Sequence, residues 1–142
     1  MTKTILLIED NPDDEELALL AYQRSRIANE MVVARDGQQA LDILLGKPGS
    51  DPVLPELVLL DLKLPKVDGL EVLRRIRANP RTHRLPVVIL TSSREEDDLI
   101  KSYDLGANSY IRKPVDFNRF AEVIEQLQMY WLVLNEAPSQ QR

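Results

Sequence analysis

Cysteine is absent from this 142-residue sequence, and histidine occurs only once, at His83. The lack of cysteine excludes disulfides, thiol nucleophiles and zinc fingers, and it is compatible with a reducing compartment. A single histidine without cysteine also leaves too few soft ligands for a transition-metal site. His83 lies in a polar stretch between Arg81 and Arg84, which favours an exposed loop position over a chemical role.

Positive charge is also scarce, and no apolar run is long enough to span a membrane. The chain has 18 Lys and Arg against 23 Asp and Glu, a formal net charge of -5, without a basic stripe that could follow the phosphates of nucleic acid. The apolar run from Ile5 to Ile8 is followed at once by acids, which indicates neither a signal peptide nor a membrane span. We expect one cytoplasmic domain with its own core and no separate output domain.

The most informative stretch is the aliphatic run from Leu57 to Leu60, which ends on Asp61. Four consecutive aliphatic residues are typical of a strand that is covered on both faces. Asp61 then lies at the carboxyl end of that strand, where open α/β sheets place their functional sites. Pro65 and Gly69 bracket the turn that follows, so a role of Asp61 in capping this turn remains an alternative.

Strands and helices are expected to alternate five times along the chain. The aliphatic and β-branched runs predict strands near residues 4–8, 31–34, 57–60, 87–90 and 109–112, with helices beginning near residues 12, 37, 70, 95 and 117. The buried face of the first helix is expected at Leu17, Leu20 and Ala21, and Gly106 is expected to end the fourth helix in a left-handed conformation. This alternation predicts an α/β fold with a parallel sheet and helices on both faces.

Functional groups follow four of the five predicted strands. Parallel strands would gather Glu9, Asp10, Asp61, Thr91 and Lys113 at one edge of the sheet. Crowded carboxylates are relieved by a divalent cation, and oxygen ligands with room for water suit Mg²⁺. The lysine and the threonine could hold phosphoryl oxygens, leaving one carboxylate as a nucleophile toward phosphorus. Taken singly, each group has a simpler explanation as a helix-start acid, a turn hydroxyl or a solvated lysine.

Four segments resemble the response-regulator receiver domain of two-component signalling: LLIEDN at 6–11, DLKLPKVDG at 61–69, VILTS at 88–92 and YIRKP at 110–114. The resemblance covers nearly the whole chain. It implies a flavodoxin-like doubly wound sheet of strand order 2-1-3-4-5. It also implies a receiver domain over residues 1–128, an apolar helical extension and tail over 129–142, and no catalysis beyond the domain's own phosphorylation and dephosphorylation.

The resemblance also assigns roles to the gathered residues. Asp61 would accept the phosphoryl group from a phosphohistidine on a sensor histidine kinase. Asp10, Asp61 and the main-chain carbonyl of Lys63 would bind Mg²⁺, with Glu9 acting through water. Lys63 and Ser93 occupy positions that the family varies to set the lifetime of the phosphate, and we expect Lys63 to affect the access of water.

The switch residues are implied in the same way. Lys113 would contact the phosphate, and its bond to Pro114 is expected to be cis. Thr91 would move to hydrogen-bond the phosphate while Tyr110 turns inward into the space that it leaves. The added charge would then select between two packings of the face formed by the fourth helix, the last strand and the last helix.

The carboxyl end departs from an ordinary receiver because its apolar pattern continues. One stripe is expected to comprise Phe120, Ile124, Leu127, Trp131 and Leu134, and the other faces carry Met129, Tyr130, Leu132 and Val133. One small sheet cannot bury a helix that is apolar all round, so we expect an isologous homodimer through Met129, Tyr130, Trp131, Val133 and Leu134. The alternative is that the tail folds back onto its own domain. This tail and the proline-bearing loop 46–56 resemble small stand-alone regulators of phytochrome-type kinases, which implies a bacteriophytochrome partner.

Other functions for the same fold remain open. A Mg²⁺-dependent aspartyl phosphohydrolase would need an acid two residues after Asp61, where Lys63 stands. A flavin module would be disfavoured because Glu9, Asp10 and their acidic neighbours would repel the flavin phosphate. A receiver that serves as a phosphate sink or a scaffold is the closest alternative to a switching regulator.

Overall fold

The computed structural model describes residues 3–24, 27, 29–114 and 116–138, and the end of the predicted tail, 139–142, lies outside them. Five parallel strands form one sheet in the order β2-β1-β3-β4-β5. The strands are β1 (Lys3–Ile8), β2 (Asn29–Ala34), β3 (Leu57–Leu60), β4 (Val87–Thr91) and β5 (Ser109–Arg112). The helices are α1 (Pro12–Arg24), α2 (Gly37–Leu45), α3 (Gly69–Ala78), α4 (Glu96–Asp104) and α5 (Phe117–Gln128), followed by a π-helix, η1 (Met129–Leu134). The predicted fold and strand order are confirmed.

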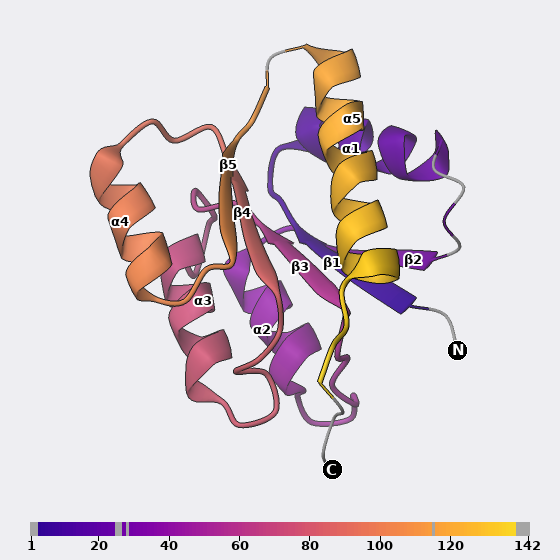
Figure 1. The fold of residues 1–142 in the computed structure, drawn as a ribbon. Coiled ribbons are helices and arrows are strands. Elements are labelled where there is room, and N and C mark those ends of the chain that lie inside the picture. Colours follow the sequence, from indigo (N-terminus) through magenta and orange to yellow (C-terminus); the bar gives the residue numbers. More distant parts are fainter. Residues whose placement is uncertain (1–2, 25–26, 28, 115, 139–142) are drawn as a thin grey trace.

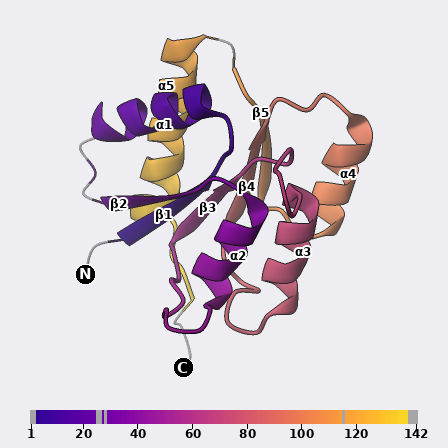
Figure 2. The ribbon, with the colours of Figure 1, turned by 180° about the vertical axis from the view of Figure 1, so that it is seen from behind.

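The sheet is covered on both faces, as the continuous aliphatic runs predicted. Helices α1 and α5 lie on one face, whereas α2, α3 and α4 lie on the other (Figures 1 and 2). Within β3, Leu57 and Leu59 pack toward α1 and α5, while Val58 and Leu60 pack toward α2 and α3. All four are buried, so no position of this strand can be polar without desolvating that group.

Side-chain caps set the starts of several helices. Asp36, Asp68 and Asp116 each accept a hydrogen bond from the backbone N–H three residues later, at the starts of α2, α3 and α5. Asn11 accepts in the same way from the first turn of α1. After α4, Gly106 has a φ of +92°, which confirms the expected left-handed turn.

The prediction for the buried face of α1 was wrong at one position. Leu20 is 42% exposed, whereas Ala18 and Ala21 are buried and Leu17 packs at the edge of the core. Helix α1 lies beside α5 as well as against the sheet, and small alanine side chains permit this close approach. The inward face is therefore selected by the neighbouring helix and not by the largest apolar side chain.

The helix at the carboxyl end changes its geometry after α5. In η1 the hydrogen bonds span five residues, as shown by the Asn135 N–H, which donates to the Tyr130 carbonyl at 2.6 Å. A π turn holds more residues than an α turn, so the next core-facing side chain is displaced along the sequence. Leu132 is consequently 2% exposed, and the predicted stripe was wrong at Leu134, which is 67% exposed.

The η1 segment lies near the amino-terminal ends of the strands, where β1 begins. The Lys3 ammonium donates to the Leu132 carbonyl, which ties the segment to the first residue of that strand. Helix α5 runs back along the sheet from the carboxyl ends of the strands toward their amino-terminal ends (Figure 1). The η1 segment is therefore on the opposite side of the domain from the acidic cluster of Glu9, Asp10 and Asp61. Within the described residues, none of the helices combines the length and apolar character needed to cross a membrane.

Candidate functional site

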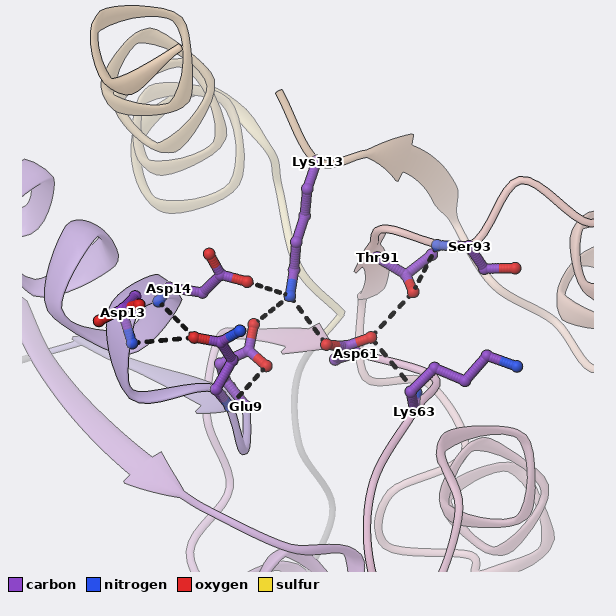
Figure 3. Close-up of polar contacts among 9 residues, drawn as sticks. Glu9, Asp13, Asp14, Asp61, Lys63, Thr91, Ser93 and Lys113 are labelled. Atoms are coloured by element: carbon purple, nitrogen blue, oxygen red, sulfur yellow. Dashed lines mark hydrogen bonds and ion pairs between the residues drawn. The ribbon is translucent and has the colours of Figure 1, made fainter. Parts of the chain in front are cut away.

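A buried ammonium lies at the carboxyl edge of the sheet among three carboxylates. Lys113 follows β5, and its Nζ lies 2.8 Å from Asp61 Oδ2 and 2.7 Å from Asp14 Oδ2, and it also contacts Glu9 Oε1 (Figure 3). The side chains of Lys113, Asp61 and Glu9 are at most 8% exposed. Residues from β1, α1, β3 and β5 thus meet at a single cation in a site with little water.

The other oxygen of Asp61 faces hydrogen-bond donors from two more segments. Asp61 Oδ1 accepts from Thr91 Oγ1 at 2.8 Å and from the Lys63 backbone N–H at 3.3 Å. Thr91 Oγ1 in turn accepts from the Ser93 N–H at 3.3 Å. These residues lie on the side of Asp61 away from Glu9 and Asp14 (Figure 3). The two carboxylate oxygens therefore have different surroundings, one cationic and one of neutral donors.

The charges of the cluster are strongly coupled. Burial, followed by the hydrogen bond and the negative charge of Asp61, raises the pKa of Glu9 to about 8. Burial also acts to raise the pKa of Asp61, but its hydrogen bonds with Glu9, Lys113 and Thr91 outweigh burial and lower it. Burial disfavours the Lys113 cation, yet the surrounding carboxylates raise its pKa above the ordinary value. Near neutral pH, Asp61 is ionised and Glu9 retains a proton.

Three acids of the site fit a divalent cation. Among the described residues, Glu9, Asp10 and Asp61 each offer one carboxylate oxygen, and these oxygens lie within 4.8 Å of one another. Asp10 is exposed, whereas the other two are buried. An oxygen-only set with one open side suits a hard cation that keeps some of its water ligands.

A groove adjoins this cluster at Asp10, the exposed member of the three acids. The groove has a volume of about 430 Å³ and is lined by Asp10, Asp68, Leu70, Asp98 and residues 62–65. It runs beside the loop between β3 and α3, which carries Lys63. The groove therefore reaches the acidic cluster at Asp10.

The proposed switch residues have an inward arrangement in this structure. Thr91 is fully buried and donates directly to Asp61. Tyr110 packs against the core on the face of the sheet that α2, α3 and α4 cover, and its hydroxyl is buried with no hydrogen-bond partner among the described residues. A buried hydroxyl without a partner costs free energy, which an exposed position of Tyr110 would recover.

The structure brings together the residues that were predicted for the phosphorylation site. Glu9, Asp10, Asp61, Thr91 and Lys113 all meet at the predicted edge. The residues predicted for dimerisation lie at the opposite edge, with η1.

Asp14 was not among the predicted site residues, yet it pairs with Lys113. Its position in the first turn of α1, one turn after Asp10, was the available signal. The expected cis bond at Pro114 was wrong, since no described residue has a cis peptide bond. The trans form is also the one that X–Pro bonds ordinarily prefer.

Comparisons with known proteins agree with this geometry. A family model described as the response regulator receiver domain matches residues 5–125. The chain is 41% identical over 132 residues to response regulator Rcp1 of Synechocystis, covering 92% of this chain and 89% of Rcp1. The Mn²⁺-bound form of Rcp1 has a TM-score of 0.89 to this structure at 38% identity, covering 96% of this chain and 99% of that one.

Two further solved structures are similar over nearly the whole chain. The phosphorylated cyanobacterial phytochrome response regulator RcpA has a TM-score of 0.92 and 38% identity, covering 98% of this chain and 100% of its own. The bacteriophytochrome response regulator RtBRR has a TM-score of 0.76 and 50% identity, covering 97% and 85%. All these similarities extend through the strands that carry the acidic cluster.

Proposed function

The chain belongs to the response-regulator receiver family, and from this membership we propose that it is a single-domain response regulator phosphorylated on Asp61 by a sensor histidine kinase. One observation carries the assignment of the acceptor. Asp61 is an ionised carboxylate held between the Lys113 ammonium and the Thr91 hydroxyl, beside two further acids. No other carboxylate in the described part of the chain has all of these neighbours.

The transfer itself needs little from the protein besides position and charge. A carboxylate oxygen of Asp61 attacks the phosphorus of the phosphohistidine, the P–N bond breaks, and the imidazole nitrogen leaves with the electron pair and takes up a proton. Lys113 and Thr91 are placed to bind the oxygens of the transferred group. Hydrolysis restores free Asp61. Water attacks the phosphorus, the P–O bond to Asp61 breaks and inorganic phosphate leaves.

We also propose Mg²⁺ as the cofactor. Asp10, Asp61 and the main-chain carbonyl of Lys63 would hold it, with Glu9 acting through water. A bound divalent ion supplies positive charge that offsets the repulsion between the acidic cluster and an incoming phosphoryl group. The spacing of the three carboxylates and the Mn²⁺-bound structure of the similar Rcp1 support this proposal.

The affinity for Mg²⁺ is expected to rise with pH. Glu9, with a pKa of about 8, holds a proton at lower pH, and a divalent ion must displace that proton. Affinity should therefore increase by up to about tenfold per pH unit below that pKa and level off above it. Calorimetric titration at several pH values, in buffers of different ionisation enthalpy, measures both the affinity and the proton released. Glu9→Gln should flatten the profile, and an unchanged slope in this variant would assign the proton to another group.

The proposed output is a change in the face formed by α4, β5 and α5. Tyr110 lies in β5, and its buried hydroxyl has no hydrogen-bond partner in the part of the chain that the structure describes. Thr91 connects the phosphorylation site to the start of the loop before α4. A phosphoryl group on Asp61 would compete for the Thr91 hydroxyl and bias the two positions of Tyr110. A phosphate sink or scaffold would use the same site without this change.

The partner is proposed to be a bacteriophytochrome kinase in the cytoplasm, since RcpA and RtBRR are described as phytochrome response regulators. We propose no catalysis beyond the domain's own phosphorylation and dephosphorylation, because Lys63 stands where an aspartyl phosphohydrolase would need an acid. The test is incubation with a radiolabelled phytochrome-type kinase. Label should enter the chain with Mg²⁺, fail to enter with EDTA, and be released by hydroxylamine, as an acyl phosphate is.

We further propose that the chain forms a homodimer through Met129, Tyr130, Trp131, Val133 and Leu134. Four of these side chains, all but the tryptophan, are 46–67% exposed, and they lie close together in η1. The Trp131 ring packs edge-on against the Tyr130 ring at 5.0 Å and also contacts the core. A contiguous exposed apolar surface of this kind is typical of an interface between subunits.

Charge placed on this surface is expected to separate the subunits. Val133→Glu with Leu134→Glu should shift the light-scattering mass from that of a dimer to that of a monomer, because the acids would be buried without partners. These positions are preferable to Trp131, whose replacement would also disturb the core. Ile100→Glu on α4, at a side chain that is 51% exposed, is the matched control and should leave the mass unchanged. An unaltered dimer in the double variant would locate the interface elsewhere.

A further inference from the structure

The Oδ1 atom of Asp61, which accepts hydrogen bonds from uncharged donors, belongs to a ring of contacts that includes one residue of α4. Asp61 Oδ1 accepts from Thr91, the Thr91 hydroxyl accepts from the Ser93 N–H, and the Ser93 hydroxyl donates to Asp98 Oδ2 at 2.6 Å. The Lys63 ammonium lies 3.9 Å from the same Asp98 oxygen. The Lys63 backbone N–H donates back to Asp61 and completes the ring.

Asp98 therefore connects the loop after β4, which carries Ser93, to the loop after β3, which carries Lys63. Its side chain is only 14% exposed, whereas the Lys63 side chain that it faces is 63% exposed. Ser93 fixes the carboxylate through a short hydrogen bond, so the negative charge has a defined position beside the flexible lysine. The neighbouring Asp97 differs, because it is 75% exposed and pairs with Lys101 along the helix surface.

Both Asp98 and Lys63 line the groove that adjoins the acidic cluster at Asp10. The Lys63 side chain reaches from the loop after β3 to Asp98 of α4. Hydrolysis of a phosphoryl group on Asp61 requires a water molecule to reach the phosphorus, with the P–O bond breaking and inorganic phosphate leaving. We expect the Lys63 side chain, which lines this groove, to affect that access of water.

We propose that Asp98 is a positioning residue that holds Lys63 across this groove and so lengthens the lifetime of phosphorylated Asp61. The proposal rests on the proposed function of Asp61 as phosphoacceptor. Without the Asp98 charge, the exposed lysine would turn toward solvent and admit water more often. The lifetime is then set by a residue of α4 that touches neither the acceptor nor the phosphoryl group.

The test is the rate at which isolated, phosphorylated protein loses its label. Asp98→Asn is the informative change, since the amide oxygen can still accept from Ser93 while the charge that attracts Lys63 is lost. We expect the label to be lost about two- to fivefold faster, because a rate change of that size corresponds to the free energy of an ion pair that is partly open to solvent. Asp97→Asn removes a charge from the same turn of α4 and should leave the rate unchanged.

A double-mutant cycle separates positioning from general loosening of the structure. Lys63→Ala should also speed hydrolysis, and adding Asp98→Asn to it should have no further effect. Asp98→Glu should restore most of the wild-type lifetime. An unchanged lifetime in Asp98→Asn, or the same acceleration with and without Lys63, would overturn the role of Asp98. A wild-type chain that takes up no label on Asp61 would instead overturn the proposed function on which this role rests.

Discussion

Replacing Asp61 with Asn is expected to reduce uptake of label from the kinase by about a thousandfold or more, as is typical when a nucleophile is removed. The neutral amide lacks the negative charge that makes a carboxylate oxygen attack phosphorus. The amide oxygen can still accept the hydrogen bond from Thr91, so the local structure should persist. Radiolabel transfer with equal amounts of folded wild-type and variant protein measures the loss.

A second variant distinguishes loss of the nucleophile from loss of charge around Lys113. Asp14→Asn removes another carboxylate that contacts the same ammonium but leaves Asp61 in place. Uptake should fall by no more than about tenfold, the size of one weakened charge contact. Equal uptake by wild type and Asp61→Asn would place the phosphoacceptor on another residue.

Gly69→Ala is expected to destabilise the fold by about 3 kcal/mol and to disturb the phosphorylation site, because it inserts a methyl group where backbone atoms already meet. A Cβ at this position would lie 2.3 Å from the Asp61 carbonyl oxygen and 2.6 Å from Leu62 Cα. The Gly69 N–H also donates to the Leu62 carbonyl at 2.9 Å, which holds the start of α3 against the end of β3. Relief of the clash must therefore move the backbone that carries Asp61.

Denaturant unfolding measures the stability of this variant, and label uptake reports on the site. Gly49→Ala is the control, because no atom lies within 4 Å of its added Cβ and only the φ of +84° opposes the substitution. That conformational penalty is about 1 kcal/mol, and phosphorylation should be unaffected. Equal losses of stability in the two variants would show that the approach of α3 to Asp61 tolerates a side chain.

The fold and most of the site could be predicted from the order of residues alone. Uninterrupted aliphatic runs such as Leu57–Leu60 require a strand covered on both faces, and their alternation with helices leaves few topologies. Asp61, Thr91 and Lys113 could be assigned to one edge because parallel strands place all their carboxyl ends together. These predictions combine local sequence patterns with the rule that parallel strands have their carboxyl ends on the same side of the sheet. They therefore do not require any knowledge of tertiary contacts.

Which side chains complete these arrangements became clear only from contacts between distant segments. Asp14 and Asp98 look like ordinary helix-start acids, and their partners Lys113 and Lys63 come from distant segments of the chain. Leu132 replaces Leu134 in the core because a π-helix shifts the phase of the last turns. Local periodicity fixes the element and its approximate faces, whereas pairing across the fold depends on distances between segments that no local pattern encodes.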